Sequence, residues 1–450
     1  MKVCDSIWIK DPLAILAENS QRGVVVRDSR IVECVPAGRE PQEPVTWVFD
    51  AARHVLIPGL INTHHHFYQT LTRSFGPSLD KELFDWLKTL YPVWKGLTSD
   101  RLRLATRVAM AELLLSGCTT TVDHHYVFPA GLEHAIDLQA EEARGLGMRV
   151  MLTRGAMDLS VADGGLPPVE VVQSTDAILA DCERVVQRYH DPGPGAMVQI
   201  ALAPCSPFSV SRRLMEESRQ LAERLDVRLH THLAETRDET DYCSSIHGCR
   251  PLEYLDRLGW VNSRVWLAHG IWFEDEEVAH LGQAGVGIAH CPASNMILAS
   301  GFCRTRDLED AGCPLGLAVD GAASNDASNM MQEVRQAFLL NRVSPHRFRI
   351  GHEDVLRWAT VGSARCLGRD DIGRIMPGQE ADLAMFTLDE FRFSGAGDPL
   401  AALVICGAHQ ADRVMVAGKW VVEDGTIPGF DLAALRRAHQ AAAREIQLSR

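Results

Sequence analysis

Long apolar runs and positive charge are both scarce in this sequence. No apolar run reaches about 18 residues, so nothing in it is long enough to cross a bilayer as a helix. The 45 Lys and Arg residues are outnumbered by 59 Asp and Glu residues, which gives a formal net charge of −14. Because nucleic acids and anionic membranes attract basic surfaces, this charge argues against either one as a partner.

Clustered cysteines are also missing. The twelve cysteines include no C-x-x-C pair, and Cys118, Cys205 and Cys291 lie within apolar runs. A free thiol in such surroundings behaves as a small hydrophobic group. The first residues lack the charged and apolar regions of a secretory signal. We therefore expect a protein of the reducing cytoplasm.

What the sequence does contain is an alternation of apolar runs and amphipathic, helix-length segments. With 450 residues, of which 46% are hydrophobic, the chain can bury a large core. The apolar runs lie at 56–66, 119–124, 149–154, 198–205, 227–232, 265–269, 287–291 and 314–320. Strands that alternate with helices in this way predict an α/β fold of the (β/α)8 TIM-barrel type rather than an open doubly wound sheet.

The two ends of the chain are rich in short β-type runs. A tight hairpin is predicted at 414–422, with its turn at Gly418-Lys419, and a closing helix at 432–447. We expect the two ends to pair into one small β-sandwich-like domain. The predicted division is 1–57 for the N-terminal part of this domain, 58–370 for the barrel, and 371–450 for its C-terminal part with the closing helix.

Histidines and acidic residues stand at the carboxyl ends of several predicted strands, where barrels of this kind keep their chemistry. Residues i and i+2 of a strand face the same side, so His64 and His66 can reach one ion. Later strands end in His232, His269 and Asp320. A lone histidine triplet is also compatible with a solvated loop or a weak adventitious site. The matching strand ends favour a catalytic metal site with imidazole and carboxylate ligands.

A mechanism can be assembled from these residues. The predicted ligands of one divalent cation are His64, His66, His232 and Asp320. Zinc is the expected ion and Fe2+ the alternative; the cation would lower the pKa of its bound water, and Asp320 would accept the proton. Glu235 can shuttle protons, and His269 can stabilise charge at the attacked carbon. Two alternatives remain: a solvated loop carboxylate for Glu235 and direct metal ligation for His269.

Lysine is nearly absent, and this bears on the number of metal ions. The chain has six lysines, and none lies between Lys95 and Lys419. In many barrel hydrolases a carbamylated lysine on the fourth strand bridges two metal ions, whereas the fourth strand here ends in Ala203-Pro204-Cys205-Ser206-Pro207. No barrel strand after the first can supply that lysine, so we predict a mononuclear centre.

Several motifs resemble those of the amidohydrolase superfamily. They are the segments 58–66, 232–235, 268–270, 290–295, 320–325 and 378–383. The similarity extends over essentially the whole chain and is typical of the mononuclear deaminase and chlorohydrolase branch. It implies a hydrolase that acts on C–N bonds of cyclic amidines, binds a small molecule, and forms a homo-oligomer, a dimer or larger.

Within that branch, the segments 64–73, 86–94, 123–128 and 203–208 resemble those of deaminases that act on 8-oxoguanine. The resemblance implies attack of metal-bound hydroxide on a free oxo-purine base, with 8-oxoguanine giving urate and ammonia. Gln69 offers a donor and an acceptor to the base edge, and Trp94 can stack on the ring. Cys205 stands where related nucleoside deaminases carry a histidine. Packing roles for Gln69, Trp94 and Cys205 are the alternative.

Other functions remain open on the same residues. Dechlorination or deamination of s-triazines and deamination of cytosine or isocytosine would use an identical metal centre, so only the pocket distinguishes them. A non-catalytic, metal-free scaffold with an amidohydrolase-like fold belongs to a different class. A metal-free scaffold would be expected to have lost some of the metal-binding residues, whereas His64, His66, His232 and Asp320 are all present.

Overall fold

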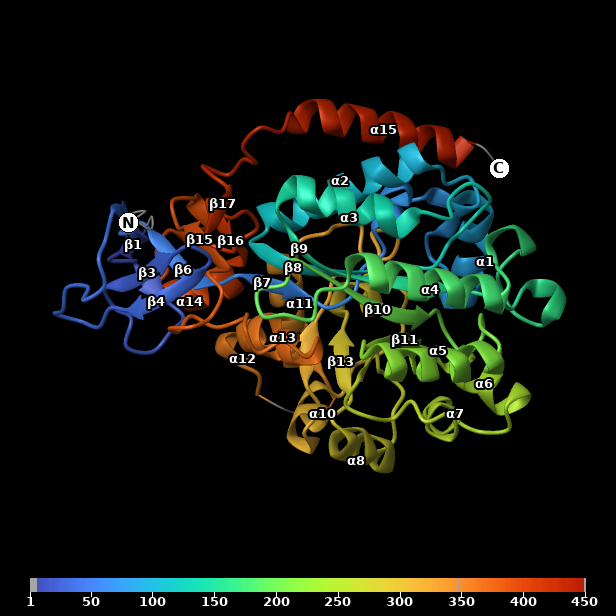
Figure 1. The fold of residues 1–450 in the computed structure, drawn as a ribbon. Helices are drawn as coiled ribbons and strands as arrows, with labels where there is room; N and C mark the ends of the chain where they lie inside the picture. The colour runs from blue at the N-terminus through green and yellow to red at the C-terminus, as the bar shows by residue number, and fades with distance from the viewer. Residues whose placement is uncertain (1–5, 346–348, 449–450) are drawn as a thin grey trace.

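The computed structural model describes residues 6–345 and 349–448. At its centre an eight-stranded parallel sheet is surrounded by helices (Figure 1). The barrel strands are β7 (Leu60–Asn62), β8 (Cys118–His125), β9 (Arg149–Ala156), β10 (Val198–Pro204), β11 (Leu229–Leu233), β12 (Val265–His269), β13 (Gly287–His290) and β14 (Leu315–Leu317). Each predicted apolar run contains or overlaps one of these strands, and the predicted (β/α)8 fold is confirmed.

The barrel closes where its first and last strands meet. The amide of Thr63, just past β7, donates to the carbonyl of Leu317 in β14 (3.1 Å). The amide of Asp320 donates to the carbonyl of His64 (3.2 Å). These bonds bring the carboxyl ends of β7 and β14 together, and with them two of the predicted metal ligands.

Helices cover the outside of the barrel, and the sequence at their ends explains where they begin. In α5 (Arg212–Leu225), the Ser211 hydroxyl caps the first turn by accepting from the amide of Leu214 (3.1 Å). The other helices are α1 (Leu83–Trp94), α2 (Ser99–Leu115), α3 (Ala135–Leu146), α4 (Thr175–Tyr189), α6 (Arg237–Ile246), α7 (Pro251–Arg257), α8 (Asp275–Ala284), α9 (Pro292–Ile297), α10 (Thr305–Ala311), α11 (Met330–Val343), α12 (His352–Arg357), α13 (Ser363–Cys366), α14 (Pro399–Ala402) and α15 (Leu432–Leu448). Among the described residues, no helix combines the length and apolarity that crossing a membrane requires.

The first predicted strand is divided in two at Pro58-Gly59. β6 (His54–Pro58) belongs to an outer sheet, and β7 begins the barrel. A Cβ atom on Gly59 would lie 2.2 Å from Oγ1 of Thr119, so only glycine lets the chain pass this close to β8. One apolar run therefore connects the outer sheet directly to the metal-binding end of β7.

Two smaller sheets lie beside the barrel. One has the order β4-β3-β1-β5, and the other has the order β17-β16-β15-β6-β2 and pairs strands from both ends of the chain. Buried side chains of Ile9, Val24, Leu56, Leu383 and Met415 join the two sheets in one hydrophobic cluster. Their remaining strands are β1 (Ser6–Lys10), β2 (Ala14–Ile15), β3 (Gly23–Arg27), β4 (Arg30–Cys34), β5 (Trp47–Asp50), β15 (Leu383–Thr387), β16 (Arg413–Val416) and β17 (Lys419–Val422). The predicted domain boundaries stay a prediction.

The C-terminal hairpin turns one residue earlier than predicted. Lys419 pairs with Val416, so the turn residues are Ala417 and Gly418, with φ of 46° and 75°. Positive φ at both positions is typical of a type I′ turn. The closing helix α15 lies across α2, on the outside of the barrel (Figure 1).

Arg149, at the start of β9, links the barrel to the outer sheet. Its buried guanidinium donates from Nε and Nη2 to the Asp382 carboxylate (2.9 and 3.1 Å) and from Nη1 to the carbonyls of Gly195 and Ala196 (both 2.7 Å). Arg149→Met would leave the Asp382 charge buried without its partner. We expect the free energy of unfolding to fall by about 3–5 kcal/mol in urea denaturation. Arg188→Met, at a side chain 59% exposed, is the control; equal losses for the two variants would contradict this role.

Candidate metal centre and active site

Imidazoles and a carboxylate from separate barrel strands meet at one point. His66 Nε2 lies 3.2 Å from His232 Nε2, and the Nε2 atoms of His64 and His66 each lie 3.3 Å from Asp320 Oδ1. His269 Nε2 is 4.0 Å from Asp320 Oδ2. The structure thus brings together the residues that the sequence analysis selected from the ends of different strands.

Hydrogen bonds at Nδ1 orient two of these rings. His66 Nδ1 donates to the carbonyl of His124, and His232 Nδ1 donates to the carbonyl of Cys205 (both 2.7 Å). A neutral imidazole that carries its proton on Nδ1 has its lone pair on Nε2. The Nε2 lone pairs of both rings therefore face the point where the histidines converge, as a metal ligand requires.

The donor set fits a divalent cation of the zinc type. His64 Nε2 is buried and makes no hydrogen bond within the described part of the chain. Burial lowers the pKa of His64 well below its ordinary value and that of His232 to about 3, so both rings are neutral. The Ser294 hydroxyl and the Gly321 amide donate hydrogen bonds to the Asp320 carboxylate (2.6 and 2.7 Å), which favours its ionised form. Neutral imidazoles and an ionised carboxylate are ligands that zinc accepts.

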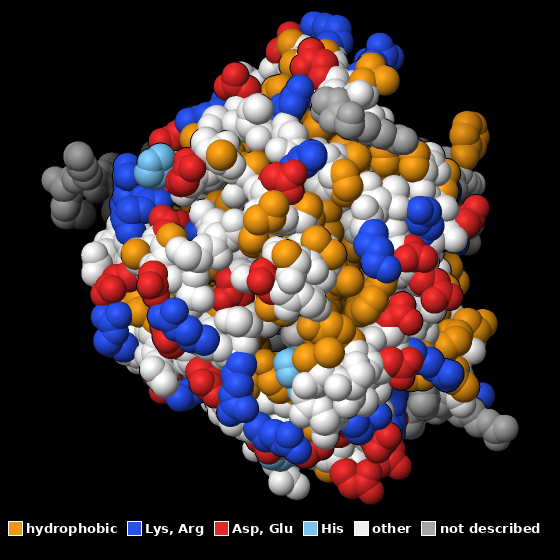
Figure 2. Space-filling model, turned by 90° about the vertical axis from the view of Figure 1, so that its right-hand side faces the viewer, with side chains coloured by type: hydrophobic (Ala, Val, Ile, Leu, Met, Phe, Trp, Pro, Cys, Tyr) orange, Lys and Arg blue, Asp and Glu red, His pale blue; other side chains and the backbone are white. Residues whose placement is uncertain are grey.

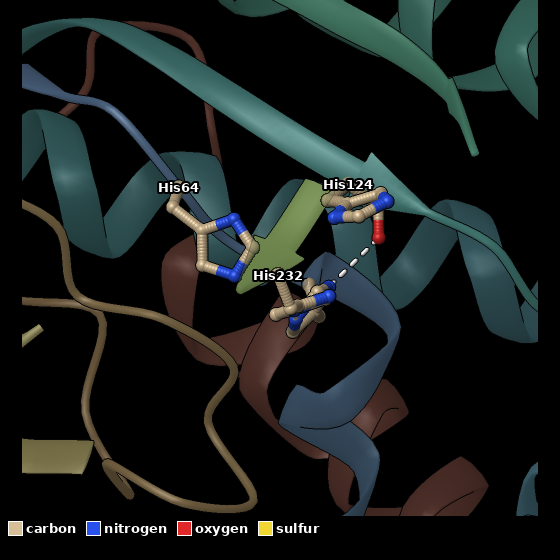
Figure 3. A group of neighbouring side chains, drawn as sticks. His64, His124 and His232 are labelled. Atoms are coloured by element: carbon tan, nitrogen blue, oxygen red, sulfur yellow. Dashed lines mark hydrogen bonds between the residues drawn. The ribbon is translucent and has the colours of Figure 1, made fainter. Parts of the chain in front are cut away.

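His124 also belongs to this group, although the sequence analysis did not assign it to the centre. A ring nitrogen of His124 lies within 4.8 Å of ligand atoms of His64, His66 and His232. Figure 3 shows the rings of His64, His124 and His232 gathered close together. The His124 ring stacks on that of His232, with 4.8 Å between ring centroids and an interplanar angle of 19°. The only sequence signal was its position at the end of the second barrel strand.

Glu235 lies beside the centre rather than in it. Its Oε2 is 3.4 Å from His269 Nε2. The buried carboxyl group of Glu239 accepts hydrogen bonds from the backbone amides of Ala234 (3.0 Å) and Glu235 (2.8 Å), which fixes the loop after β11. Burial and repulsion by Asp320 raise the pKa of Glu235 well above its ordinary value. Glu235 can therefore carry a proton at neutral pH.

Three residues at these strand ends have a strained backbone conformation. Ala234, His269 and Asp320 have φ values of 53°, 71° and 60°, in the left-handed region that non-glycine residues rarely adopt. His269 is also held through its side chain, since its Nδ1 lies 3.0 Å from Oδ1 of Asn295. Each such conformation costs on the order of 1–3 kcal/mol and is typical of functional sites.

A small cavity, with about 30 Å³ of free volume, lies in front of the centre. It is lined by His66, Gln69, Leu83, Trp86, Leu87, Tyr91, Tyr126, Cys205, Phe208, His232, Glu235, His269, Leu298, Asp320 and Ser324. Figure 2 shows one face of the molecule, where hydrophobic side chains gather near the middle and both signs of charge lie around them. Gln69 and Cys205, two of the three predicted substrate contacts, face this cavity.

Trp94, the third predicted contact, does not line the cavity. Its ring is fully buried against those of Tyr68, Trp86 and Tyr91, at centroid distances of 5.2, 5.5 and 5.8 Å, and its Nε1 donates to Oγ1 of Thr72 (3.1 Å). Trp94 therefore has the packing role that the sequence analysis gave as the alternative to substrate stacking. Both tryptophans lie on the same face of α1, but the cavity ends at Tyr91, and so Trp86 is the tryptophan that reaches it.

Ser294 holds the carboxylate of Asp320. Its hydroxyl donates to Asp320 Oδ2 (2.6 Å), and the Ser324 hydroxyl makes a longer bond to the same oxygen (3.3 Å). Because ligand-orienting partners commonly contribute 10- to 100-fold to metal affinity, we expect Ser294→Ala to weaken zinc binding about tenfold. Competition with a chelator measures this affinity. Ser324→Ala, the matched control, should have a smaller effect; the reverse order would contradict this assignment.

An eight-stranded barrel with a His/Asp cluster at the carboxyl ends of its strands defines a class of metal-dependent barrel hydrolases. The model of the amidohydrolase family matches residues 55–421. This chain is a hydrolase that belongs to the amidohydrolase family, and the resemblance noted in the sequence is confirmed.

Individual relatives narrow the comparison. The chain is 60% identical to the 8-oxoguanine deaminase of Pseudomonas aeruginosa over 97% of this chain and 98% of that protein. It is 36% identical to an isoxanthopterin deaminase from an unknown prokaryotic organism, over 90% and 88% of the two chains. Among solved structures, it resembles atrazine chlorohydrolase from Arthrobacter aurescens complexed with zinc, with a TM-score of 0.91, 31% identity, and coverage of 97% and 100%.

Proposed function

We propose that this protein is a hydrolytic deaminase that converts 8-oxoguanine and water into urate and ammonia. The observation that carries the proposal is the position of Glu235, a buried carboxyl group with a raised pKa that lies next to the metal-binding cluster and lines a small cavity. The 60% identity to an 8-oxoguanine deaminase over 97% of the chain supports this choice of substrate.

The residues of the chain can be given roles in this reaction. His64, His66, His232 and Asp320 would hold one zinc ion, which supplies the Lewis-acid chemistry that makes water nucleophilic at neutral pH. Asp320 accepts a proton from the attacking water. Glu235 delivers its proton to the ring nitrogen beside the attacked carbon, then takes up the proton from Asp320 and passes it to the departing amino group. Ammonia leaves, and the hydroxyl proton released as the new carbonyl forms returns to Glu235. His269 stabilises the charge that develops at the attacked carbon.

The cavity supports a flat free base as substrate. Trp86 takes the stacking role that we had expected of Trp94, because it is the tryptophan that faces the cavity. Gln69 can present its amide group to the edge of an oxo-purine. Cys205 adds a small thiol in place of a polar group that would bind a ribose.

An ammonia-release screen of the zinc-loaded protein tests this proposal. The substrates are 8-oxoguanine, guanine, isoxanthopterin, isocytosine, cytosine, adenosine, S-adenosylhomocysteine and a melamine-type triazine. We expect the highest kcat/KM for 8-oxoguanine. A preference for a nucleoside would overturn the assignment. A preference for the triazine would favour the second candidate, s-triazine hydrolysis, which the likeness to atrazine chlorohydrolase supports.

Three further properties are proposed: the identity of the metal ion, the cellular compartment and the oligomeric state. The imidazole-rich donor set favours zinc over Fe2+, which metal analysis of the purified protein tests. The eleven described cysteines are all free, in keeping with a reducing cytoplasm. A homo-oligomer, dimer or larger, is expected from the family resemblance, and analytical ultracentrifugation tests it.

A further inference from the structure

His230 is a buried histidine with no role so far. It lies on β11, two residues before His232, and is fully inaccessible to solvent. Its Nε2 is 2.7 Å from Nδ1 of His64, and its Nδ1 is 2.8 Å from the carbonyl oxygen of Trp266 on β12. His230 thus connects one of the predicted ligands to the backbone of a neighbouring barrel strand.

The Trp266 carbonyl determines where the protons lie on His230 and His64. The Trp266 carbonyl can only accept, so the His230 proton lies on Nδ1. The Nε2 of His230 then carries a lone pair and accepts from His64, whose proton must lie on Nδ1. This leaves the lone pair of His64 on Nε2, the buried atom 3.3 Å from Asp320 Oδ1 that has no hydrogen bond of its own.

His64 differs in this respect from the neighbouring ligand rings. His66 and His232 each donate from Nδ1 directly to a backbone carbonyl. A backbone carbonyl is present whatever the side chain at that position is. The orientation of His64 instead depends on a side chain, and a single substitution can remove its acceptor.

The ring of His230 is fixed by its neighbours. Trp266 stacks on it, with 4.4 Å between ring centroids and an interplanar angle of 14°. The indole Nε1 of Trp266 donates to the carbonyl of Thr63, the residue before His64 (3.1 Å). The contacts therefore form a closed circuit from His64 through His230 and Trp266 back to Thr63. In such a circuit His230 has little freedom to turn its acceptor away from His64.

We propose that His230 is a positioning residue that fixes the tautomer of His64 and so presents the lone pair of His64 Nε2 to the metal ion. This inference rests on the metal-dependent function proposed above. Its test measures metal binding separately from deamination. Loss of metal affinity on substitution of His230, in a protein that deaminates no base, would uphold this inference and overturn the proposed function.

The test compares His230→Phe with His230→Gln. Phenylalanine keeps a ring against Trp266 but removes the acceptor, and we expect zinc affinity to fall about 10- to 100-fold. Glutamine restores an acceptor oxygen for His64 and a donor for the Trp266 carbonyl, so it should recover most of that affinity. Affinity is measured on metal-free protein by competition with a chromophoric chelator. The absorption spectrum of the Co2+-loaded protein should change in the Phe variant and much less in the Gln variant.

A matched control and a measurement on the unaltered protein complete the test. His125→Phe replaces another buried barrel histidine, one that packs against Tyr68 and Phe128, and should leave zinc affinity unchanged. In the metal-free natural chain, histidine-selective 15N NMR should find the His64 proton on Nδ1, which can be determined even if a variant fails to fold. A proton on His64 Nε2, wild-type zinc affinity in His230→Phe, or no recovery in His230→Gln would each overturn the proposal.

Discussion

Replacing Glu235 by Gln is expected to reduce the deamination of 8-oxoguanine by about 10²- to 10⁴-fold while zinc stays bound. The amide keeps the size and neutrality of the protonated carboxyl group but cannot deliver a proton to the ring nitrogen or the departing amine. Zinc should stay because Glu235 is not one of the clustered ligands: its Oε2 faces His269 at 3.4 Å. Ammonia release measures kcat, and metal analysis measures zinc per chain.

Glu216→Gln is the matched control, because Glu216 lies on the outer surface of α5 in an ion pair with Arg212. Its kcat and zinc content should equal those of the unaltered protein. If Glu235→Gln retained activity within tenfold of the unaltered protein, the proton would have to travel by another route. If it lost its zinc instead, Glu235 would be a ligand rather than a proton carrier.

The barrel, and every member of the metal cluster except His124, could be predicted from the sequence, because both depend on local pattern and one topological rule. Parallel strands that alternate with helices present their carboxyl ends at one mouth, so residues far apart in sequence, such as His66, His232 and Asp320, must meet there. The two-residue spacing of His64 and His66 then places both on one side of the chain.

The details that the sequence did not predict depend on tertiary contacts. The break of the first strand at Gly59 follows from the close approach of Thr119, a residue 60 positions later. The choice between Trp86 and Trp94 depends on where the cavity ends along one face of α1. The contact of His230 with His64 crosses the barrel interior, and no periodicity in β11 distinguishes a ring that meets a ligand from one that fills the core.

Asp320→Asn is expected to impair both zinc binding and turnover, unlike the change at Glu235. Asp320 Oδ1 lies 3.3 Å from the Nε2 atoms of His64 and His66, so the substitution removes the only negative charge in the predicted ligand set. It also removes the proton acceptor for the attacking water. We expect zinc affinity to fall at least about 10- to 100-fold and kcat to fall about 10²- to 10⁴-fold. Asp176→Asn, at a side chain 79% exposed, is the control.

Excess zinc separates the two roles of Asp320. A residue that only ligates the metal can be compensated by mass action, because a higher zinc concentration refills a weakened site. A residue that also accepts a proton cannot, since the refilled site still lacks the base. We therefore expect saturating zinc to restore the metal content of Asp320→Asn but not its kcat, with both measured on the same sample. Recovery of full turnover would mean that Asp320 only binds the metal ion and that another residue at the centre is the base. Glu235, whose carboxyl group lies nearest to His269, would then be the candidate.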